Sequence, residues 1–172
     1  MSFRSDRGRP LDPGSLGDHL DRLYRAAWGL CGSREEAEDL VQDTYARVLA
    51  KPRFLRRDDD LGYLLRVMRN TFVSGLRTSS RRPRTVELLE ERADPRSEAG
   101  DLHVESRVLL AAVASLPDDY RDVLAAVDLA GLSYREAGKA LGIREGTVMS
   151  RLFRARQKVM AAVNPQRAVS TE

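Results

Sequence analysis

The sequence predicts an all-α protein made of two small helical domains joined by a flexible acidic linker. Good helix formers (Ala, Leu, Arg and Glu) dominate the 172 residues, and aromatic residues make up only 6%. Charged residues reach 32%, a surface-rich balance that suits two small helical domains better than one thick core. Apolar residues also recur at helical spacing in both halves of the chain.

Signals for helix ends define the predicted elements. Ser33 with Glu36, and Ser133 with Glu136, have the S-x-x-E form of a capping box, in which each residue satisfies a backbone N–H of the other. Ser74-Gly75 predicts a break within the third helix. The predicted helices cover residues 15–30, 33–51, 61–78, 104–116, 118–130, 134–141 and 145–163.

The domain boundaries follow from composition. The start of the chain is polar and rich in Gly and Pro, and the segment between the halves carries two prolines, many charges and few large apolar residues. We therefore expect a disordered N-terminus (1–14), a first domain (15–80), a linker (81–103), a second domain (104–164) and a disordered tail (165–172).

Charge is unevenly distributed along the chain, although the formal net charge is only +3. Residues 61–86 hold six arginines and no acid, and residues 87–122 hold ten acids against four arginines. Residues 144–158 hold five bases against Glu145 alone. Two basic blocks separated by an acidic one predict two nucleic-acid surfaces with a spacer between them.

The second domain contains the most informative pattern. A short helix over 134–141, a turn at Gly142 and a longer basic helix over 145–163 form the helix-turn-helix pattern, with the small Ala137 where the two helices must cross closely. The apolar stripe of the longer helix consists of Val148, Leu152, Ala155, Val159 and Val163. Its opposite face carries hydroxyls and cations suited to phosphates and base edges, namely Thr147, Ser150, Arg151, Arg154 and Lys158. This pattern predicts DNA binding.

Three segments of this region resemble one family closely. They are Ser115-Leu-Pro117, Leu132-Ser-Tyr-Arg-Glu-Ala137 and Gly146-Thr-Val-Met-Ser-Arg-Leu-Phe-Arg-Ala-Arg156. Together they resemble the promoter-binding fourth region of extracytoplasmic-function (ECF) bacterial sigma factors. The resemblance implies that the longer helix binds the −35 duplex.

The first domain resembles the second region of the same family. Glu38-Asp-Leu-Val-Gln-Asp-Thr-Tyr45 is similar to its polymerase-docking helix, which implies that Asp39, Gln42 and Asp43 contact RNA polymerase. Tyr63-Leu-Leu-Arg-Val-Met-Arg-Asn70 is similar to the segment that holds an unstacked base of the −10 element. The residues implied in −10 binding are Phe54, Arg56, Arg57, Arg66, Arg69 and Asn70.

Two positions depart from the family pattern, and a nearby segment adds negative charge. Tyr63 stands where the family usually has Trp, and Ser74 where it usually has Asp. Asp58-Asp-Asp60 places negative charge in the loop expected near DNA, so the −10 preference is expected to differ from the common one.

Several other classes of protein are disfavoured. The two histidines, His19 and His103, lie in segments with little predicted order, and His19 and Cys31 lack metal-ligand partners at usable spacing, so no metal is expected. There is no phosphate-binding Gly loop or nucleophile elbow, so neither a cofactor nor an enzymatic activity is expected. One cysteine fits a reducing cytoplasm, and no apolar run approaches membrane-spanning length.

The resemblance implies a sigma factor with three kinds of partner: core RNA polymerase, promoter DNA and an anti-sigma factor. Two alternatives stay open at this point. One is a one-component helix-turn-helix regulator without polymerase docking, and the other is a regulator that mimics a sigma factor without initiating transcription.

Overall fold

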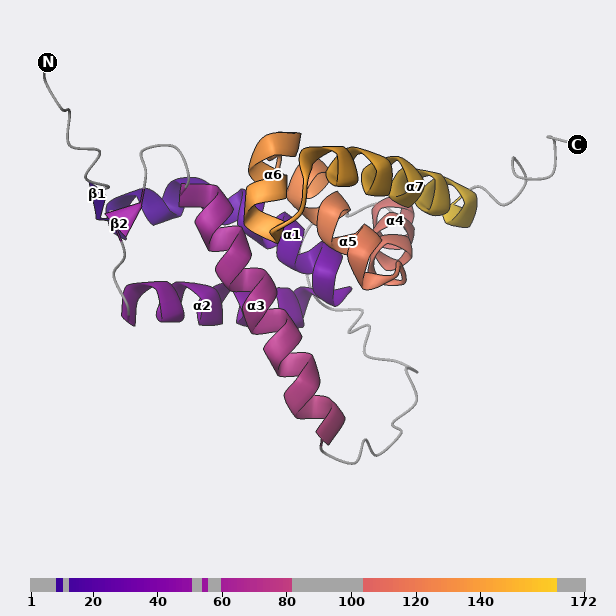
Figure 1. The fold of residues 1–172 in the computed structure, drawn as a ribbon. Coiled ribbons are helices and arrows are strands. Elements are labelled where there is room, and N and C mark those ends of the chain that lie inside the picture. The colour runs from indigo at the N-terminus through magenta and orange to yellow at the C-terminus, as the bar shows by residue number, and fades with distance from the viewer. Residues whose placement is uncertain (1–8, 11–12, 51–53, 56–59, 82–103, 164–172) are drawn as a thin grey trace, which may run out of the picture.

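The computed structural model describes residues 9–10, 13–50, 54–55, 60–81 and 104–163. An N-terminal unit contains helices α1 (Leu20–Cys31), α2 (Arg34–Ala50) and α3 (Asp60–Arg81). A C-terminal unit contains α4 (Val104–Ala114), α5 (Asp118–Leu124), the π-helix η2 (Ala125–Leu129), α6 (Tyr134–Leu141) and α7 (Glu145–Val163). Helix α1 lies between α2 and the C-terminal unit (Figure 1).

The N-terminal segment is more regular than its composition predicts. Arg9–Pro10 (β1) pairs antiparallel with Phe54–Leu55 (β2), and a 3₁₀ helix, η1 (Pro13–His19), leads into α1. The expectation of disorder over 1–14 is therefore wrong at residues 9–10 and 13–14, because the pairing partner of β1 lies more than forty residues away in the sequence. Pro10 lacks a backbone N–H, which a strand at the edge of a sheet tolerates.

Helix α3 is continuous, so the predicted break at Ser74-Gly75 is wrong. Both residues are exposed, and a Cβ at Gly75 would meet nothing within 4 Å. A glycine at an exposed helical position costs only about 1 kcal/mol, so the surrounding helix is retained.

The predicted helix over 118–130 contains a change of helix type that the sequence pattern did not indicate. After α5 the backbone widens into η2, in which the Ala130 N–H donates to Ala125 O (2.9 Å). The Asp128 carboxylate on this turn accepts from Arg156 Nε (2.9 Å) and Nη2 (2.6 Å). This ion pair, with its two parallel hydrogen bonds, connects η2 to α7.

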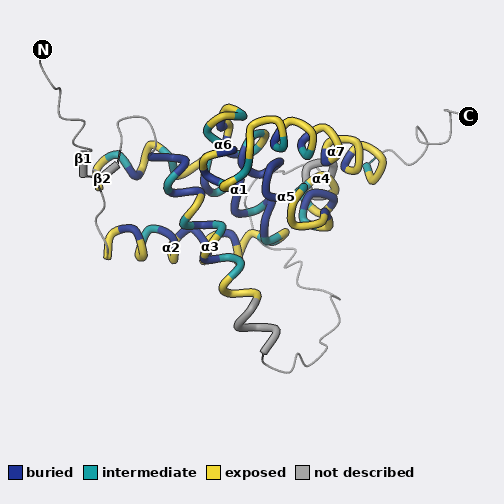
Figure 2. The backbone as a smooth tube through the Cα atoms, viewed as in Figure 1, coloured by how far each residue is buried: buried dark blue, intermediate teal, exposed yellow. Residues whose placement is uncertain are grey.

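Hydrophobic burial joins the two units. One cluster includes Leu23 and Met68 of the N-terminal unit together with Ala126, Leu132 and Ala137 of the C-terminal unit. Figure 2 shows this buried band where α1, α3 and α6 meet. A second cluster lies within the C-terminal unit and contains Ala112, Val113, Leu116, Val123, Leu124, Leu152, Ala155 and Val159.

Candidate DNA and polymerase interfaces

The turn before α6 is fixed by a complete capping box. Ser133 Oγ accepts from the Glu136 N–H (3.3 Å), and Glu136 Oε2 accepts from the Ser133 N–H (2.8 Å). The Ser133 hydroxyl also donates to Glu136 Oε2 (2.6 Å), and this bond, together with that from the Ser133 N–H, lowers the pKa of Glu136 below its usual value. Helix α6 ends at Gly142, which has a φ of 71°, a left-handed conformation that glycine adopts without strain. The first helix of the motif therefore has both ends where the sequence predicted them.

The crossing of α6 and α7 depends on two small residues. Ala137 is fully buried, in agreement with its predicted role. Gly138 is the tighter position, because a Cβ there would lie 2.9 Å from the Ile143 carbonyl oxygen. The sequence reading missed Gly138, whose signal was a second small residue beside Ala137.

Helix α7 has the two faces predicted from its periodicity. Four of the predicted apolar residues are buried and Val163 is half-buried. On the predicted DNA face, Ser150, Arg154 and Lys158 are exposed, and Thr147 is half-buried. Lys158 lies over the Tyr120 ring of α5, with Nζ 5.9 Å from the centroid. Arg154 forms no ion pair with any other residue that the structure describes, so its guanidinium faces solvent.

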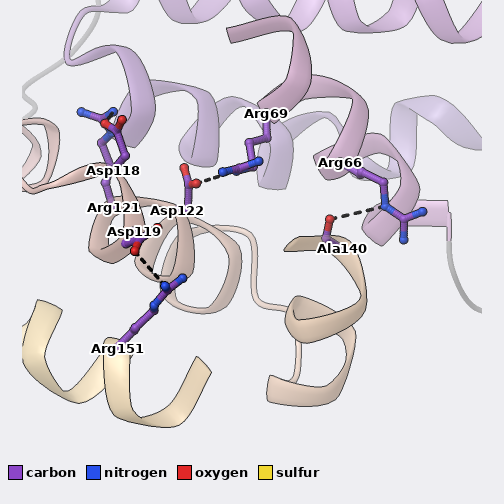
Figure 3. Close-up of polar contacts among 8 residues, drawn as sticks. All are labelled: Arg66, Arg69, Asp118, Asp119, Arg121, Asp122, Ala140 and Arg151. Carbon is purple, nitrogen blue, oxygen red and sulfur yellow. Dashed lines mark hydrogen bonds and ion pairs between the residues drawn. The ribbon is translucent and has the colours of Figure 1, made fainter. Parts of the chain in front are cut away.

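Arg151 differs from Arg154 because it already has a partner. Its Nη2 lies 2.7 Å from Asp119 Oδ2 at the start of α5 (Figure 3). The pair borders an open hollow of about 490 Å³ lined by Pro117, Asp118, Asp119, Tyr120, Thr147, Ser150, Arg151 and Arg154. The predicted DNA face therefore includes a shallow hollow, at whose edge the Asp119 carboxylate forms an ion pair with the Arg151 guanidinium.

Two exposed apolar residues extend the outward face of α7. The side chains of Phe153 and Met149 are 64% and 52% exposed. Apolar side chains on a recognition helix can contact the methyl group of thymine. The sequence analysis did not include these two residues. The signal that could have indicated them is their spacing of four residues, which puts both on one helix face outside the buried stripe.

The predicted polymerase-docking residues share one exposed surface of α2. Asp39, Gln42 and Asp43 are all exposed. The opposite face of α2 is buried through Ala37, Leu40, Val41, Thr44 and Val48. The acidic stripe is therefore held on a helix whose other face is anchored in the core.

The predicted −10 residues have four different outcomes. Asn70 is exposed on α3, whereas Arg66 and Arg69 point to the C-terminal unit. Phe54 lies in β2, where the backbone alone is described. Arg56 and Arg57 lie outside the described residues.

The acidic loop expected near DNA is one residue shorter than the sequence suggested. Asp60 is buried and is the first residue of α3, where a carboxylate is favoured by the helix dipole. Asp58 and Asp59 lie outside the described residues.

Comparisons with known proteins cover both units. A family model described as sigma-70 region 2 matches residues 16–82, and one described as sigma-70 region 4 matches residues 106–159. The chain is 32% identical over 140 residues to the ECF RNA polymerase sigma factor EcfG of Rhodopseudomonas palustris, covering 81% of this chain and 77% of EcfG. It is 30% identical over 148 residues to SigM of Bacillus subtilis, covering 85% of this chain and 91% of SigM. The chain belongs to the ECF group of RNA polymerase sigma factors.

Other relatives of this ECF sigma factor differ from it in length. It is 38% identical over 150 residues to SigE of Mycolicibacterium smegmatis, covering 82% of this chain but only 57% of SigE. Among solved structures, RpoE of Bartonella quintana, in complex with the anti-sigma factor NepR, matches with a TM-score of 0.73 and 27% identity, covering 89% of this chain and 96% of RpoE. CnrH, at 22% identity and a TM-score of 0.58, shares the fold.

Among the residues that the structure describes, the cysteine and the potential metal ligands of this sigma factor form no further site. Burial raises the pKa of the Cys31 thiol to about 12, so the thiol stays protonated near neutral pH. Within the described ranges, no three His, Cys, Asp or Glu side chains are grouped to hold a metal ion. None of the helices described here has the length and hydropathy needed to span a membrane.

Proposed function

We propose that this ECF sigma factor binds core RNA polymerase through α2 and directs promoter-specific initiation by contacting DNA through α7 and α3. The observation that carries the proposal is the pairing of an exposed acidic stripe on α2 with an exposed basic face on α7. Both lie in a chain that matches sigma region 2 and sigma region 4 in that order. A helix-turn-helix regulator without polymerase docking does not account for the region 2 match.

The stripe of Asp39, Gln42 and Asp43 is the proposed polymerase contact. An acidic exposed surface repels DNA and complements a basic protein surface. The anchored face of α2 keeps the three side chains on one side, so the stripe is presented without rearrangement. Their role is electrostatic orientation of the docked complex.

The −35 duplex is the proposed ligand of α7. Arg154 and Arg151 can form two parallel hydrogen bonds to guanine O6 and N7, and Ser150 and Thr147 can donate to phosphates or bases. Lys158 extends the cationic face by one turn. Phe153 adds an apolar surface for thymine methyl groups.

The melted −10 strand is the proposed ligand of α3 and the segment before it. The Asn70 side-chain amide both donates and accepts, so it can read the edge of an unstacked base. Arg66, Arg69 and the arginines of the preceding segment supply positive charge for the strand. Phe54 supplies a ring on which a base can stack.

The proposal also covers the class of the protein, its location and its regulator. The chain itself is a specificity subunit and not an enzyme, it acts in the cytoplasm, and an anti-sigma factor restrains it. The likeness to RpoE, which is bound by NepR in its solved structure, supports the last point.

Run-off transcription tests this function. The purified chain is added to core RNA polymerase with a promoter library cloned upstream of a common template, and transcripts are sequenced. We expect discrete start sites that depend on the chain. Reversal of Asp39 and Asp43 to Lys should weaken core binding in a pull-down, whereas reversal of Glu35, an exposed acid in the first turn of α2, serves as the control. Undiminished binding by the Asp39 and Asp43 variant, or no chain-dependent start site, would refute the proposal.

A further inference from the structure

Two neighbouring arginines in the middle of α7 have different surroundings. They belong to the segment Arg154-Ala-Arg156. Arg154 forms no ion pair within the described ranges, whereas the Arg156 guanidinium lies against the Asp128 carboxylate of η2, with Nε 2.9 Å from Oδ2 and Nη2 2.6 Å from Oδ1. The DNA contacts proposed for α7 do not include Arg156, whose guanidinium is already bound within the protein.

The contact between Arg156 and Asp128 sets an orientation as well as a distance. Two N–H groups of one planar guanidinium donate to the two oxygens of one carboxylate, so the two planar groups are aligned. The side chains are 51% and 30% exposed, so solvent screens their charges and the pair adds little to the stability of the domain. What the pair constrains is the direction of α7 relative to η2.

The turn that carries Asp128 is itself held in place. Ala125 and Ala126 of η2 are buried, and Leu129 packs directly against Gly29 of α1. Because a π turn is wound more widely than an α turn, the side chains after Ala125 point in directions that a continued α-helix would not give them. Asp128 is therefore presented to α7 from a fixed position.

Arg156 also interacts with the first helix of the helix-turn-helix motif. Tyr134, the first residue of α6, is half-buried and packs against both apolar clusters. The hydrogen bonds to Asp128, and to a lesser degree an interaction with Tyr134, raise the pKa of Arg156 above its usual value. One guanidinium thus connects η2, α6 and α7.

The position of Arg156 on α7 separates it from the cationic face. Arg154 and Lys158 each lie two residues away, a spacing at which side chains on a helix do not face each other. Leu152 lies four residues before Arg156 and belongs to the buried stripe, so Arg156 borders that stripe. Its side chain is directed to the domain that carries α7.

We propose that Arg156 is a positioning residue, which sets the angle of α7 in the −35 duplex by binding Asp128 and does not itself contact the DNA. This inference rests on the proposed function, because it takes the −35 duplex as the ligand of α7. A recognition helix places several side chains on base edges at once, so a small rotation weakens all of these contacts together.

The effect of removing Asp128 distinguishes a positioning residue from a DNA contact. If Arg156 were a DNA contact, loss of Asp128 would release it for DNA and would remove a negative charge, so binding would tighten. If Arg156 is a positioning residue, loss of Asp128 frees α7 to rotate, and binding weakens. The two roles therefore predict changes of opposite sign.

The test compares variants of the full chain. Arg156→Ala and Asp128→Ala each remove one side of the pair, and the exchanged pair, Arg156→Asp with Asp128→Arg, restores it at unchanged net charge. Arg154→Ala, in the same segment, removes a proposed DNA contact. Arg25→Ala removes an exposed cation of α1 and controls for the loss of one charge. Circular dichroism verifies that each variant is folded at the temperature of the assay.

The first readout is fluorescence anisotropy at several KCl concentrations, with a duplex selected in vitro by the unaltered chain. An exposed ion pair shifts an equilibrium by about 1.4- to 5-fold, so we expect Arg156→Ala and Asp128→Ala to weaken binding by up to about fivefold. The exchanged pair should recover most of this loss, and Arg25→Ala should change little. Arg156→Ala should keep the salt dependence of the unaltered chain, because loss of a phosphate contact would reduce the slope by about one.

The second readout measures the orientation of α7 without DNA. Spin labels are attached to cysteines introduced at Lys139 of α6 and Ala162 of α7, which are both exposed, in a Cys31→Ser background. Double electron–electron resonance then gives the distribution of distances between the labels. We expect Arg156→Ala and Asp128→Ala to broaden this distribution, and the exchanged pair to return it to that of the unaltered chain.

Three results would overturn the positioning role: tighter binding by Asp128→Ala, a salt slope reduced by about one in Arg156→Ala, or unchanged affinity of both folded variants. Failure of the proposed function looks different, because the unaltered chain would then select no duplex, and the label distances alone would judge the pair. A chain that selects a duplex, but whose affinity and label distances do not respond to loss of the pair, keeps its proposed function and loses this inference.

Discussion

The ion pair between Arg151 and Asp119 allows a quantitative test of the −35 surface. Asp119→Asn removes the carboxylate charge while keeping the side-chain shape, so Arg151 loses its intramolecular partner. The two side chains are 29% and 63% exposed, which places their 2.7 Å contact in a largely solvated setting. Pairs of this kind contribute about 0.2–1 kcal/mol, and DNA binding must give up that energy before Arg151 can reach a base or phosphate.

We therefore expect Asp119→Asn to tighten −35 duplex binding by about 0.2–1 kcal/mol, or roughly 1.4- to 5-fold in Kd. The measurement is fluorescence anisotropy with a duplex selected in vitro by the unaltered protein. Arg154→Ala and Arg151→Ala should each weaken binding by about 1–3 kcal/mol if each makes a two-bond base contact, with the smaller loss at Arg151 because its intramolecular pair offsets part of the gain.

A double-mutant cycle decides whether release of Arg151 is the cause. In an Arg151→Ala background, Asp119→Asn should have little effect. An equal gain in both backgrounds would show that the general loss of negative charge near DNA is responsible. Asp118→Asn controls for that loss, because Asp118 is a neighbouring acid paired with Arg121. An unchanged affinity of the Asp119→Asn single variant would show that Asp119 and DNA do not compete for Arg151.

Three further outcomes are expected. Asn70→Ala should reduce permanganate reactivity of the melted −10 strand while leaving −35 duplex binding intact, and normal reactivity would count against the role of α3. Leu152→Ala should lower the free energy of unfolding by about 2–5 kcal/mol in urea titrations, because Leu152 is buried in the C-terminal cluster; a change below about 1 kcal/mol would contradict it. Since the pKa of Glu136 is lowered in the folded chain, its contribution is present above the usual value of 4.5 and is lost as pH falls through the lowered pKa. Glu136→Gln keeps the acceptor for the Ser133 N–H without titrating, so it should lose less stability than the unaltered chain between about pH 6 and about pH 3.

Local signals predicted the helix-turn-helix well. The bounds of α6 and α7 agree with the sequence reading, because the Ser133 capping box and Gly142 are complete within a few residues. The buried stripe of α7 was equally accessible, since side chains three and four residues apart share a helix face. Information of this kind needs no knowledge of the rest of the fold.

Features that depend on contacts between residues far apart in the sequence could not be predicted from such local signals. Asp122 and Asp118 look alike in sequence, yet one is buried against an arginine 53 residues away and the other is exposed. The β1–β2 pair and the Arg66 contacts to α6 have the same non-local origin. The composition showed that α3 is basic. Which groups its arginines contact depends on the tertiary fold.

The close approach of Gly29 to Leu129 has a consequence for chimeric sigma factors. A fourth region transplanted from a relative would bring its own side chain to the position of Leu129, directly against the α1 backbone. A side chain in place of Gly29 would put its Cβ 2.3 Å from Leu129 Cδ1, so the Leu129 side chain would have to move. Exchange of the two regions between relatives therefore requires a steric fit between residues 29 and 129, in addition to a compatible promoter preference.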